Sequence, residues 1–216
     1  MKVSIIIAVY KNITALKLII KALKQQTYKN FEVIIVEDCQ EKEMLNYIKS
    51  IEDLEIIHTT QEDLGIRKAR SQNNGILAST GEYLIFIDGD CIPYTTFIER
   101  HVALSEKKSV LCGRRVNLNK KTTEKIFNNK TSAYDIEKTY LLQTNLIFDK
   151  SVKYEQGIQL NPKSWIYKKL LTSKKRNLTI LGCNFSCFKE DFIAINGFDE
   201  GYNGTALSDD TDLTWR

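Results

Sequence analysis

Two groups of acidic residues in this sequence could do chemistry, and the first is the short motif from Asp88 to Asp90. It follows the apolar run Tyr-Leu-Ile-Phe-Ile, so two carboxylates stand one residue apart at the end of an expected strand. Magnesium and manganese are commonly held by one or two carboxylates, with water and substrate phosphates as the other ligands. The motif therefore predicts a site for a metal ion that carries a diphosphate. A polar Asp-Gly turn is the alternative explanation of the motif taken alone.

The second acidic group is Asp209, Asp210 and Asp212, which follow Ser208 near the end of the sequence. In the first turn of a helix these acids would be stabilised by the helix dipole, which is the structural explanation. A carboxylate held ionised beside a sugar can also accept the proton of an attacking hydroxyl. Neighbouring side chains on a helix diverge by about 100°, so only one acid can point squarely at that hydroxyl. Asp212 is expected to brace the turn or to pair with a basic residue.

Further candidates for ligand binding stand at the ends of other expected elements. Tyr10 follows the first apolar run and could stack on a base, and Asp38 follows the second and could accept from a base N–H. Arg67, Lys68 and Arg70 open an expected helix whose N-terminal end favours an anion. Each also has a structural explanation, as a core cap, a turn residue or a solvated basic face.

Other chemistries are not indicated by the residue pattern. His58 and His101 lack a metal-ligand spacing and suggest no Ser-His-Asp set. No P-loop pattern is present. The cysteines lack Cys-x-x-Cys spacing and are expected to be reduced thiols; they are Cys39, Cys91, Cys112, Cys183 and Cys187.

The elements that must position these residues alternate between strands and helices. Continuous apolar runs predict strands, and apolar residues at helical spacing predict helices. The expected strands are 2–9, 31–37, 54–58 and 83–88, and the expected helices are 13–26, 41–51 and 66–79. This alternation predicts an α/β fold with a doubly wound, mostly parallel sheet. In such a sheet ligands bind beyond the carboxyl ends of the strands, where the candidates stand.

The second half of the sequence is less regular. Residues 110–113 are expected to form a fifth strand, and the polar stretch 117–130 a loop. Residues 178–188 are expected to be ordered again, followed by a turn around Gly197 and a last helix capped by Ser208. That helix reaches Arg216 without a termination signal, so we expect a chain truncated at its C-terminus.

Size and charge limit the class of protein. A chain of 216 residues with 43% hydrophobic residues can bury one substantial core, so a single domain is expected. The formal net charge of +4 is spread along the sequence, which does not indicate nucleic-acid binding. No run approaches the roughly 20 apolar residues of a membrane span, and the opening run does not have the form of a signal peptide. A cytoplasmic protein is expected.

Several segments together resemble the family 2 glycosyltransferases. The most specific is QEDLGIRKARSQNNGILASTGEYLIFIDGDCIP, residues 61–93, which resembles the family's Arg-bearing helix joined to its metal motif. Residues 3–12 are similar to the opening strand and loop, with Ala8 where many members have proline. Residues 182–204 are similar to an acceptor-side segment shared with galactosyltransferases. The resemblance implies the Rossmann-like GT-A fold with a smaller mixed acceptor-binding region, and a transfer that inverts the anomeric centre.

The resemblance also implies roles for individual residues. Asp210 matches the catalytic base, with Asp209 in the place of the family's glutamate. Asp90 matches a ligand of Mn²⁺ or Mg²⁺, and Asp88 matches a contact to the metal or the ribose; Cys91 stands where many members have another acid. Asp38 is implied to contact a uracil ring. The remaining residues of the implied nucleotide-sugar site are Ala8, Tyr10, Arg67, Arg70 and Gly89.

The expected function is therefore a metal-dependent, inverting glycosyltransferase. It would move a hexose or N-acetylhexosamine from a nucleoside-diphosphate sugar, a UDP-sugar, to a hydroxyl of a glycan or lipid-linked acceptor in surface polysaccharide synthesis. Residues 1–115 are expected to bind the donor and residues 116–216 the acceptor. The alternatives are a non-catalytic sugar-nucleotide-binding module or fragment, and a nucleotidyltransferase, although residues 9–14 lack the glycine and arginine of that class.

A basic amphipathic stretch adds an expectation about location. Between residues 163 and 176, apolar residues including Trp165 and Leu170 are interspersed with lysines and Arg176. Such segments lie at membrane interfaces, so peripheral contact with an anionic membrane at its inner face is one interpretation. A core-packing helix with a solvated basic face is the other.

Overall fold

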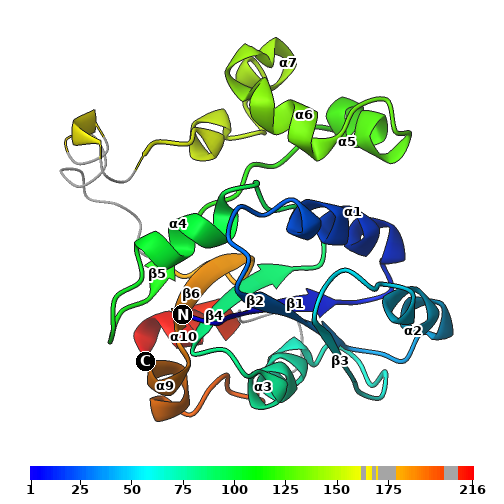
Figure 1. Cartoon of the computed structure of the whole chain (residues 1–216), viewed down its shortest axis with the longest axis vertical. Helices are drawn as coiled ribbons and strands as arrows, with labels where there is room; N and C mark the ends of the chain where they lie inside the picture. The colour runs from blue at the N-terminus through cyan, green and yellow to red at the C-terminus, as the bar shows by residue number, and fades with distance from the viewer. Residues whose placement is uncertain (162–163, 167–168, 170–178, 202–208) are drawn as a thin grey trace. The chain divides into compact units, whose positions relative to one another are not determined.

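The computed structural model describes residues 1–161, 164–166, 169, 179–201 and 209–216. The chain divides into two compact units: Met1–Gly113 together with Thr179–Arg216, and Arg114–Leu178. The first unit contains the sheet and all the candidate site residues named above (Figure 1).

The sheet has six strands in the order β3-β2-β1-β4-β6-β5. Their bounds are β1 Val3–Val9, β2 Phe31–Glu37, β3 Ile56–Thr60, β4 Tyr83–Asp88, β5 Leu111–Cys112 and β6 Asn184–Phe188. Strands β1 to β4 are mutually parallel, and β6 runs antiparallel to both β4 and β5. The chain leaves β1 toward β2 and β3 and then returns to β4 on the other side of β1. The predicted α/β fold with a mostly parallel, doubly wound sheet is confirmed, and β1 and β4 flank the switch point where such sheets bind ligands.

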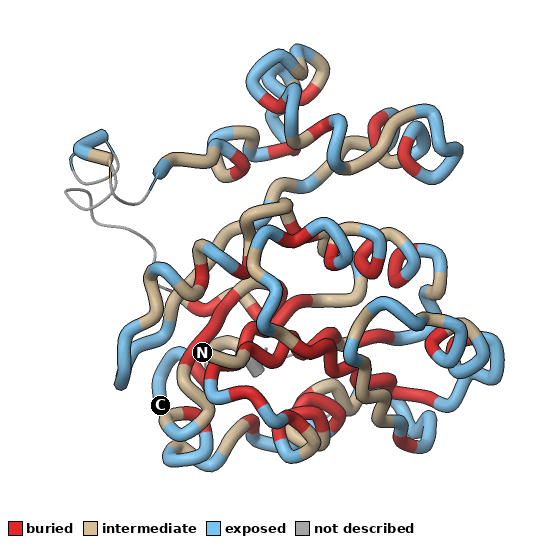
Figure 2. The backbone as a smooth tube through the Cα atoms, in the orientation of Figure 1, coloured by how far each residue is buried: buried red, intermediate tan, exposed pale blue. Residues whose placement is uncertain are grey.

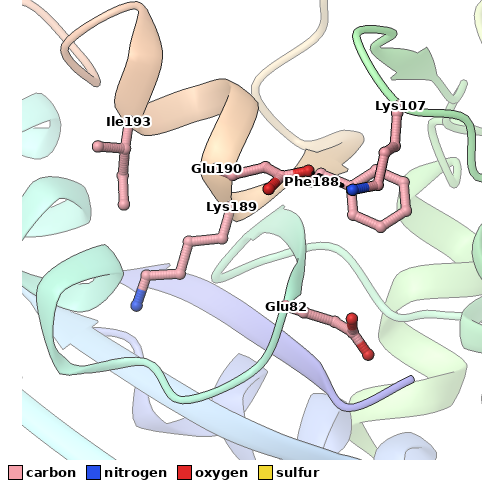
Figure 3. A pocket seen from close by; sticks show the side chains of 6 residues that line it. All are labelled: Glu82, Lys107, Phe188, Lys189, Glu190 and Ile193. Carbon is pink, nitrogen blue, oxygen red and sulfur yellow. Dashed lines mark hydrogen bonds and ion pairs between the residues drawn. The ribbon is translucent and has the colours of Figure 1, made fainter.

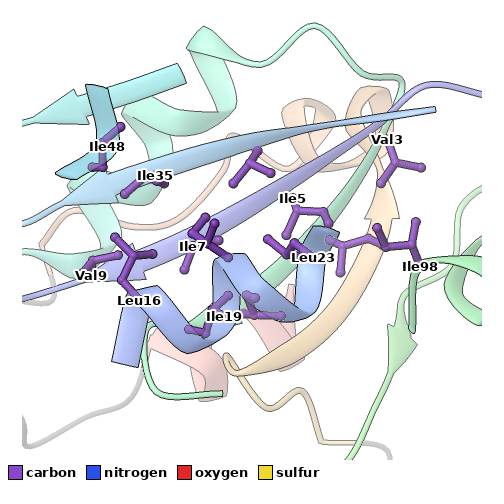
Figure 4. Packing of buried hydrophobic residues seen from close by; sticks show 14 of the residues in the cluster. Val3, Ile5, Ile7, Val9, Leu16, Ile19, Leu23, Ile35, Ile48 and Ile98 are labelled. Atoms are coloured by element: carbon purple, nitrogen blue, oxygen red, sulfur yellow. The ribbon is translucent and has the colours of Figure 1, made fainter. Parts of the chain in front are cut away.

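Helices cover both faces of this sheet (Figure 1). The helices α1 Ile13–Lys24, α2 Lys42–Lys49 and α4 Phe97–Ala103 pack on one face, and α3 Lys68–Ala78, α9 Lys189–Ala194 and α10 Asp209–Trp215 on the other. In β1, Ile5 and Ile7 point into the first core, and Ile6 points into the second. Figure 4 shows the first core, where Leu16 and Ile19 of α1 lie over β1. Burial on both faces explains the unbroken apolar runs of β1, β2 and β4, which Figure 2 shows as largely buried.

The second unit is built from short helices. They are α5 Lys120–Phe127, α6 Ala133–Lys138 and α7 Thr144–Ile147, with 3₁₀ turns η1 Tyr140–Leu142 and η2 Tyr154–Gly157. The rings of Tyr140 and Tyr154 stack with centroids 4.5 Å apart, and each hydroxyl donates to the other residue's carbonyl oxygen. This reciprocal pair joins the two 3₁₀ turns.

The loop expected over residues 117–130 is wrong, because α5 occupies most of it. Asn119 caps this helix, its side chain accepting from the backbone N–H of Thr122 at 3.0 Å. Thr122 and Ile126, one turn apart, are the buried residues of the helix. With a single apolar residue among them, the buried positions did not produce a recognisable helical pattern.

Smaller differences concern element boundaries. The strand expected at 54–58 runs from Ile56 to Thr60, and within the expected stretch 178–188 the described strand is β6. Gly197 has a φ of +67°, as suits the predicted turn. Ser208 and most of the basic stretch 163–176 lie outside the described residues. Among the helices that the structure describes, none combines the length and apolar character needed to cross a membrane.

Candidate active site

The carboxyl ends of three neighbouring strands bring the first candidate residues together. Ala8 is opposite Asp88 in the pairing of β1 with β4, and Val9 is opposite Glu37 in the pairing of β1 with β2. The backbone N–H of Asp38 donates to the Val9 carbonyl at 3.1 Å. Tyr10, Asp38 and Asp88 thus emerge at one edge of the sheet, although they are far apart in the sequence.

The Asp88 to Asp90 motif forms a tight turn at this edge. The backbone N–H of Cys91 donates to the Asp88 carbonyl at 3.0 Å, which closes the turn. A Cβ atom on Gly89 would lie 2.7 Å from the carbonyl oxygen of Ala8, so only glycine allows this close approach. Asp88 forms an ion pair with Lys68, with Oδ1 2.6 Å from Nζ. The side chain of Asp90 is exposed.

These two carboxylates suit a hard divalent cation bound together with a diphosphate. Within the described parts of the chain, no cluster of three or more His, Cys, Asp or Glu side chains could hold a metal alone. Mg²⁺ in phosphate-transferring sites is typically bound through one or two carboxylates, and substrate phosphates complete its shell. Asp88 and Asp90 fit this donor set, and the Lys68 ammonium adds a positive charge beside Asp88.

Asp38 organises the start of α3. Its Oδ2 accepts from the backbone N–H of Arg67 at 2.7 Å, and its Oδ1 accepts from Nε2 of Gln61 at 2.5 Å. Arg67 is the N-cap of α3, and Arg70 lies one turn further on with its side chain exposed. Sequence reasoning did not single out Gln61, although a polar residue directly after β3 is a signal of the same kind as Tyr10 and Asp38.

Sequence reasoning also missed Lys11 and Asp63, two further residues at this edge. Tyr10 is 54% exposed, and its hydroxyl donates to Oδ1 of Asp63 at 3.4 Å. Lys11 forms an ion pair with the other oxygen of Asp63 at 2.6 Å. The hydrogen-bonded ion pair lowers the pKa of Asp63 and raises the pKa of Lys11. Lys11 has a φ of 50°, a left-handed conformation that turns the chain directly after Tyr10.

Asp210 lies close to the same turn, although it comes from the last helix. Its Oδ2 accepts from the backbone N–H of Gly182 at 2.8 Å, and a Cβ atom at residue 182 would collide with its Oδ1. Gly182 stands two residues before Asn184, which pairs with Ile87 next to Asp88. The carboxylate is therefore held beside the carboxyl end of β4.

A contact between two thiols supports this placement. Cys91, which closes the Asp88 to Asp90 turn, hydrogen-bonds to Cys183, and this contact together with burial raises the pKa of Cys91. The turn and the segment that holds Asp210 are therefore adjacent. Asp209 begins α10, and Asp212 pairs with Arg216 at 2.5 Å, which is the basic partner expected for this acid.

A pocket of about 320 Å³ lies at the other end of β4 (Figure 3). It is lined by Glu82 before β4, Phe188 at the end of β6 and Ile193 of α9, with Lys107, Lys189 and Glu190. Lys107 pairs with Glu190 at 2.7 Å, and Lys189 donates to the Ser79 carbonyl at 2.7 Å. The pocket does not include any of the candidate residues, and it is separated from Asp88 by the length of the strand.

Comparisons with known proteins give the family and the fold of this chain. A family model described as "Glycosyl transferase family 2" matches residues 4–189, and one described as "N-terminal domain of galactosyltransferase" matches residues 169–214. An Escherichia coli protein named UDP-Glc:alpha-D-GlcNAc-diphosphoundecaprenol beta-1,3-glucosyltransferase is 29% identical over 140 residues, covering 65% of this chain and 49% of that protein.

Two solved structures share the fold. S. aureus TarS in complex with UDP has a TM-score of 0.65 at 17% identity, covering 99% of this chain and 54% of that one. A Pyrobaculum calidifontis mannosyltransferase in complex with GDP-Man and Mn²⁺ has a TM-score of 0.58 at 14% identity, covering 98% of this chain and 50% of that one. The chain spans about half the length of each of these three proteins. With the family model matching most of its length, this chain belongs to glycosyl transferase family 2.

Proposed function

We propose that this chain transfers a hexose or N-acetylhexosamine from a UDP-sugar to a hydroxyl of a glycan or lipid-linked acceptor in surface polysaccharide synthesis. The observation that carries the proposal is the meeting of Asp88, Asp90 and Asp210 at one edge of the sheet. Family membership supports a transferase. The E. coli relative named for UDP-Glc and the TarS complex with UDP support a uridine nucleotide.

The proposed reaction is a single in-line displacement. The acceptor oxygen forms a bond to the anomeric carbon while the bond from that carbon to the phosphate oxygen breaks, which inverts the centre. The acceptor proton passes to the carboxylate of Asp210, and Asp209 shares the start of the same helix in the proposed catalytic pair. No covalent intermediate on the protein is needed.

The departing nucleoside diphosphate develops negative charge, and the chain offers positive charge where it leaves. Asp90, with Asp88, would hold Mn²⁺ or Mg²⁺, which neutralises this charge when bound. Lys68 lies 2.6 Å from Asp88 and can contact the same phosphates. The Mn²⁺ complex of the P. calidifontis protein supports a metal in this fold.

The rest of the proposed donor site lies along the same edge. Tyr10 presents an exposed ring for stacking on the base. Asp38 holds Gln61 and Arg67 at the start of α3, next to the proposed position of the base. Gly89 lies against the Ala8 carbonyl, an approach that only glycine allows, and both residues belong to the proposed site for the ribose and phosphates. Arg67 and Arg70 add positive charge near the start of α3.

The proposal assigns donor binding to residues 1–115 and acceptor binding to residues 116–216. The lipid diphosphate in the E. coli relative's name supports a lipid-linked acceptor. Such an acceptor would be met at the inner, cytoplasmic face of a membrane, where the basic stretch 163–176 would contact anionic lipid.

Calorimetry with UDP, with and without Mn²⁺, tests the donor site. We expect binding that strengthens with Mn²⁺, because the metal needs the phosphates to complete its shell, and an Asp90→Asn variant that loses this difference. Asp199→Asn, a change of the same kind in an acid outside the site, should behave as the unmodified chain. Equal UDP affinity with and without the metal would contradict the metal role. Release of sugar from a UDP-sugar then distinguishes an enzyme from a binding module.

A further inference from the structure

The charges of the chain are divided unevenly between its two units. Residues 114–178 carry fifteen Lys and Arg against five Asp and Glu, a net charge of +10. The other unit carries sixteen against twenty-two, a net charge of −6, and the two values together give the +4 of the whole chain. The even spread of charge expected from the sequence is therefore wrong. The second unit attracts an anionic partner, and the first repels it.

Large apolar side chains are also exposed more densely on the second unit. Among the described residues, nine of the seventeen exposed large hydrophobic side chains lie between residues 114 and 178, which make up less than a third of the chain. Phe148 is 83% exposed and Leu142 is 78% exposed. Exposed apolar groups gathered on one part of a protein mark an interaction surface. The second unit thus combines positive charge with exposed apolar side chains.

Four of these side chains belong to one short turn. Leu141 and Leu142 are in η1, and Ile147 and Phe148 stand at the end of α7, which follows η1 directly (Figure 1). Leu146, also in α7, is 0% exposed and anchors the turn in the core of the unit. The four exposed side chains, here named the apolar turn, are therefore held at the surface by a buried neighbour.

Exposed lysines stand on both sides of the apolar turn in the sequence. Lys138 precedes it, and Lys150 and Lys153 follow it; these three are here named the flanking lysines. The Lys138 ammonium lies 4.3 Å from the ring centre of Tyr134. Lysine and tyrosine side chains combine an apolar body with a polar end, so they suit the boundary between lipid headgroups and acyl chains.

We propose that the apolar turn inserts into the surface of an anionic membrane and that the flanking lysines bind the lipid phosphates. The inference deepens the proposed function, because it names the surface by which the chain reaches a lipid-linked acceptor. Either signal alone gives weak binding, so stable contact needs both. A nucleic acid fits the lysines but not the turn, since its phosphates are contacted by charged and polar groups and not by exposed leucines.

Flotation with vesicles tests the apolar turn. Vesicles of phosphatidylglycerol and phosphatidylcholine in equal parts are compared with phosphatidylcholine alone. The unmodified chain is compared with Leu142→Ser plus Phe148→Ser, and with the matched control Leu77→Ser plus Trp215→Ser in the first unit, at residues 80% and 83% exposed. We expect the anionic vesicles to bind the unmodified chain and the control, and to bind the first double variant about tenfold or more weakly.

A second pair of variants tests the flanking lysines. Lys150→Gln plus Lys153→Gln should weaken binding to the anionic vesicles about tenfold or more, because each lysine near such a surface is attracted to it. Lys21→Gln plus Lys29→Gln, at exposed lysines of the first unit, changes the net charge equally and should keep binding within about threefold. Raising the salt concentration from about 0.1 M to about 0.5 M should release much of the unmodified chain.

A fluorescence measurement replaces the first double variant if that variant does not fold. Phe148→Trp places an indole in the apolar turn, where insertion would move it from water into lipid. Its emission should shift to the blue on anionic vesicles by more than that of the unmodified chain, whose Trp165 and Trp215 are 69% and 83% exposed. An equal shift in the two proteins would overturn the insertion.

Other results overturn the inference in ways that can be told apart. If the unmodified chain does not bind anionic vesicles at low salt, the surface is not a membrane site, and calorimetry with UDP shows whether the proposed function still stands. If Leu142→Ser plus Phe148→Ser binds as tightly as the unmodified chain, the apolar turn does not insert. Tighter binding to single-stranded RNA than to anionic vesicles would assign the basic unit to a nucleic acid. A dimer that this double variant dissociates, seen by light scattering without lipid, would assign the turn to a second copy of the chain.

Discussion

The carboxylate of Asp210 depends on a single glycine. The backbone N–H of Gly182 donates to it, and any side chain at residue 182 would occupy its place. A hydrogen bond from a backbone N–H to a carboxylate favours the ionised form, in which the proposed general base would act. Its neighbour Asp212 is engaged with Arg216 instead.

Asp210→Asn should lower turnover by about a hundredfold or more and leave UDP affinity nearly unchanged, because the amide keeps the shape but cannot accept a proton. Steady-state transfer from a UDP-sugar, with calorimetry for the affinity, measures both effects. Asp212→Asn is the matched control and should keep most of the activity. Turnover of Asp210→Asn close to that of the unmodified chain would refute the assignment, and a loss in Asp209→Asn instead would move the base by one residue.

At the scale of elements, buried polar side chains join strands that the apolar core alone does not align. Glu32 of β2 is 0% exposed and accepts from Ser4 of β1 at 2.6 Å and from the backbone N–H of Thr80, before β4, at 2.6 Å. Lys2 adds an ion pair at 3.0 Å. These contacts connect three neighbouring strands at the end of the sheet opposite the candidate active site.

Glu32 should make the fold sensitive to acid. Burial would raise its pKa, but the hydrogen bonds from Ser4 and Thr80 outweigh it and lower the pKa from 4.5 to about 2. A lowered folded-state pKa gives stability that is present above pH 4.5 and lost as the pH falls toward 2. Urea unfolding should show a loss of up to about 3 kcal/mol across that window, which Glu32→Gln lacks. Glu82→Gln, a change at an exposed residue, should lose stability in acid as the unmodified chain does. An unmodified chain that loses no stability between pH 4.5 and 2 would contradict the prediction.

His101 of α4 links another set of elements through a directed chain of hydrogen bonds. Its Nε2 lies 3.1 Å from the Asn184 side-chain oxygen, an acceptor, so this nitrogen carries the hydrogen. Its Nδ1 then accepts from Ser186 at 2.6 Å, and Ser186 accepts from Tyr83 at 2.7 Å. Asn184 is two residues from Gly182, so this chain supports the segment that holds Asp210.

Protonation of His101 should therefore weaken the fold in mild acid. The imidazole is 5% exposed, and burial lowers its pKa from 6.5 to about 4. The neutral form is favoured in the folded state, so stability is present above pH 6.5 and is lost as the pH falls toward 4. Proton NMR should show one imidazole, identified by its absence in His101→Gln, that stays neutral at pH 5. A titration of this ring near pH 6.5 would show that the hydrogen-bonded chain does not form.

At the scale of the whole molecule, the proposed donor site and Asp210 lie in one compact unit, and residues 114–178 form the other. The two chain segments of the first unit can be linked directly, without the second unit, because they already meet: the N–H of Gly113 donates to the Asn184 carbonyl at 2.8 Å. Thr179 precedes Asn184 by five residues, a reach of at most about 17 Å. A short linker therefore suffices to join residues 113 and 179.

A chain in which eight Gly and Ser residues replace 114–178 should bind UDP in Mn²⁺ within about threefold of the unmodified affinity, since the first unit keeps its core. It should not transfer sugar to an acceptor if the second unit supplies acceptor contacts. Calorimetry and a transfer assay measure the two properties, and hydrolysis of the UDP-sugar reports whether the catalytic groups remain in place. Loss of UDP binding in a folded variant would show that donor binding needs both units.

The sequence by itself determined the four parallel strands of the sheet and the edge at which to look for chemistry. The apolar runs of β1, β2 and β4 and the helical spacing in α1 depend on residues close in the chain, so they can be read directly. The positions of Tyr10, Asp38 and Asp88 after their strands follow from the same pattern. Helix α5 was not predicted, because its buried positions, Thr122 and Ile126, include a single apolar residue.

Only the tertiary structure decided which side chains touch. Asp38 was expected to face a ligand, yet its partners Gln61 and Arg67 come from 23 and 29 residues away. Asp210 meets Gly182 across 28 residues, and the hydrogen bond from Tyr10 to Asp63 joins loops 53 residues apart. Local patterns predict elements because the spacing of apolar residues along a helix or a strand involves only residues close in the chain. Contacts between loops depend on how strand order and register place distant segments side by side, which no local pattern contains.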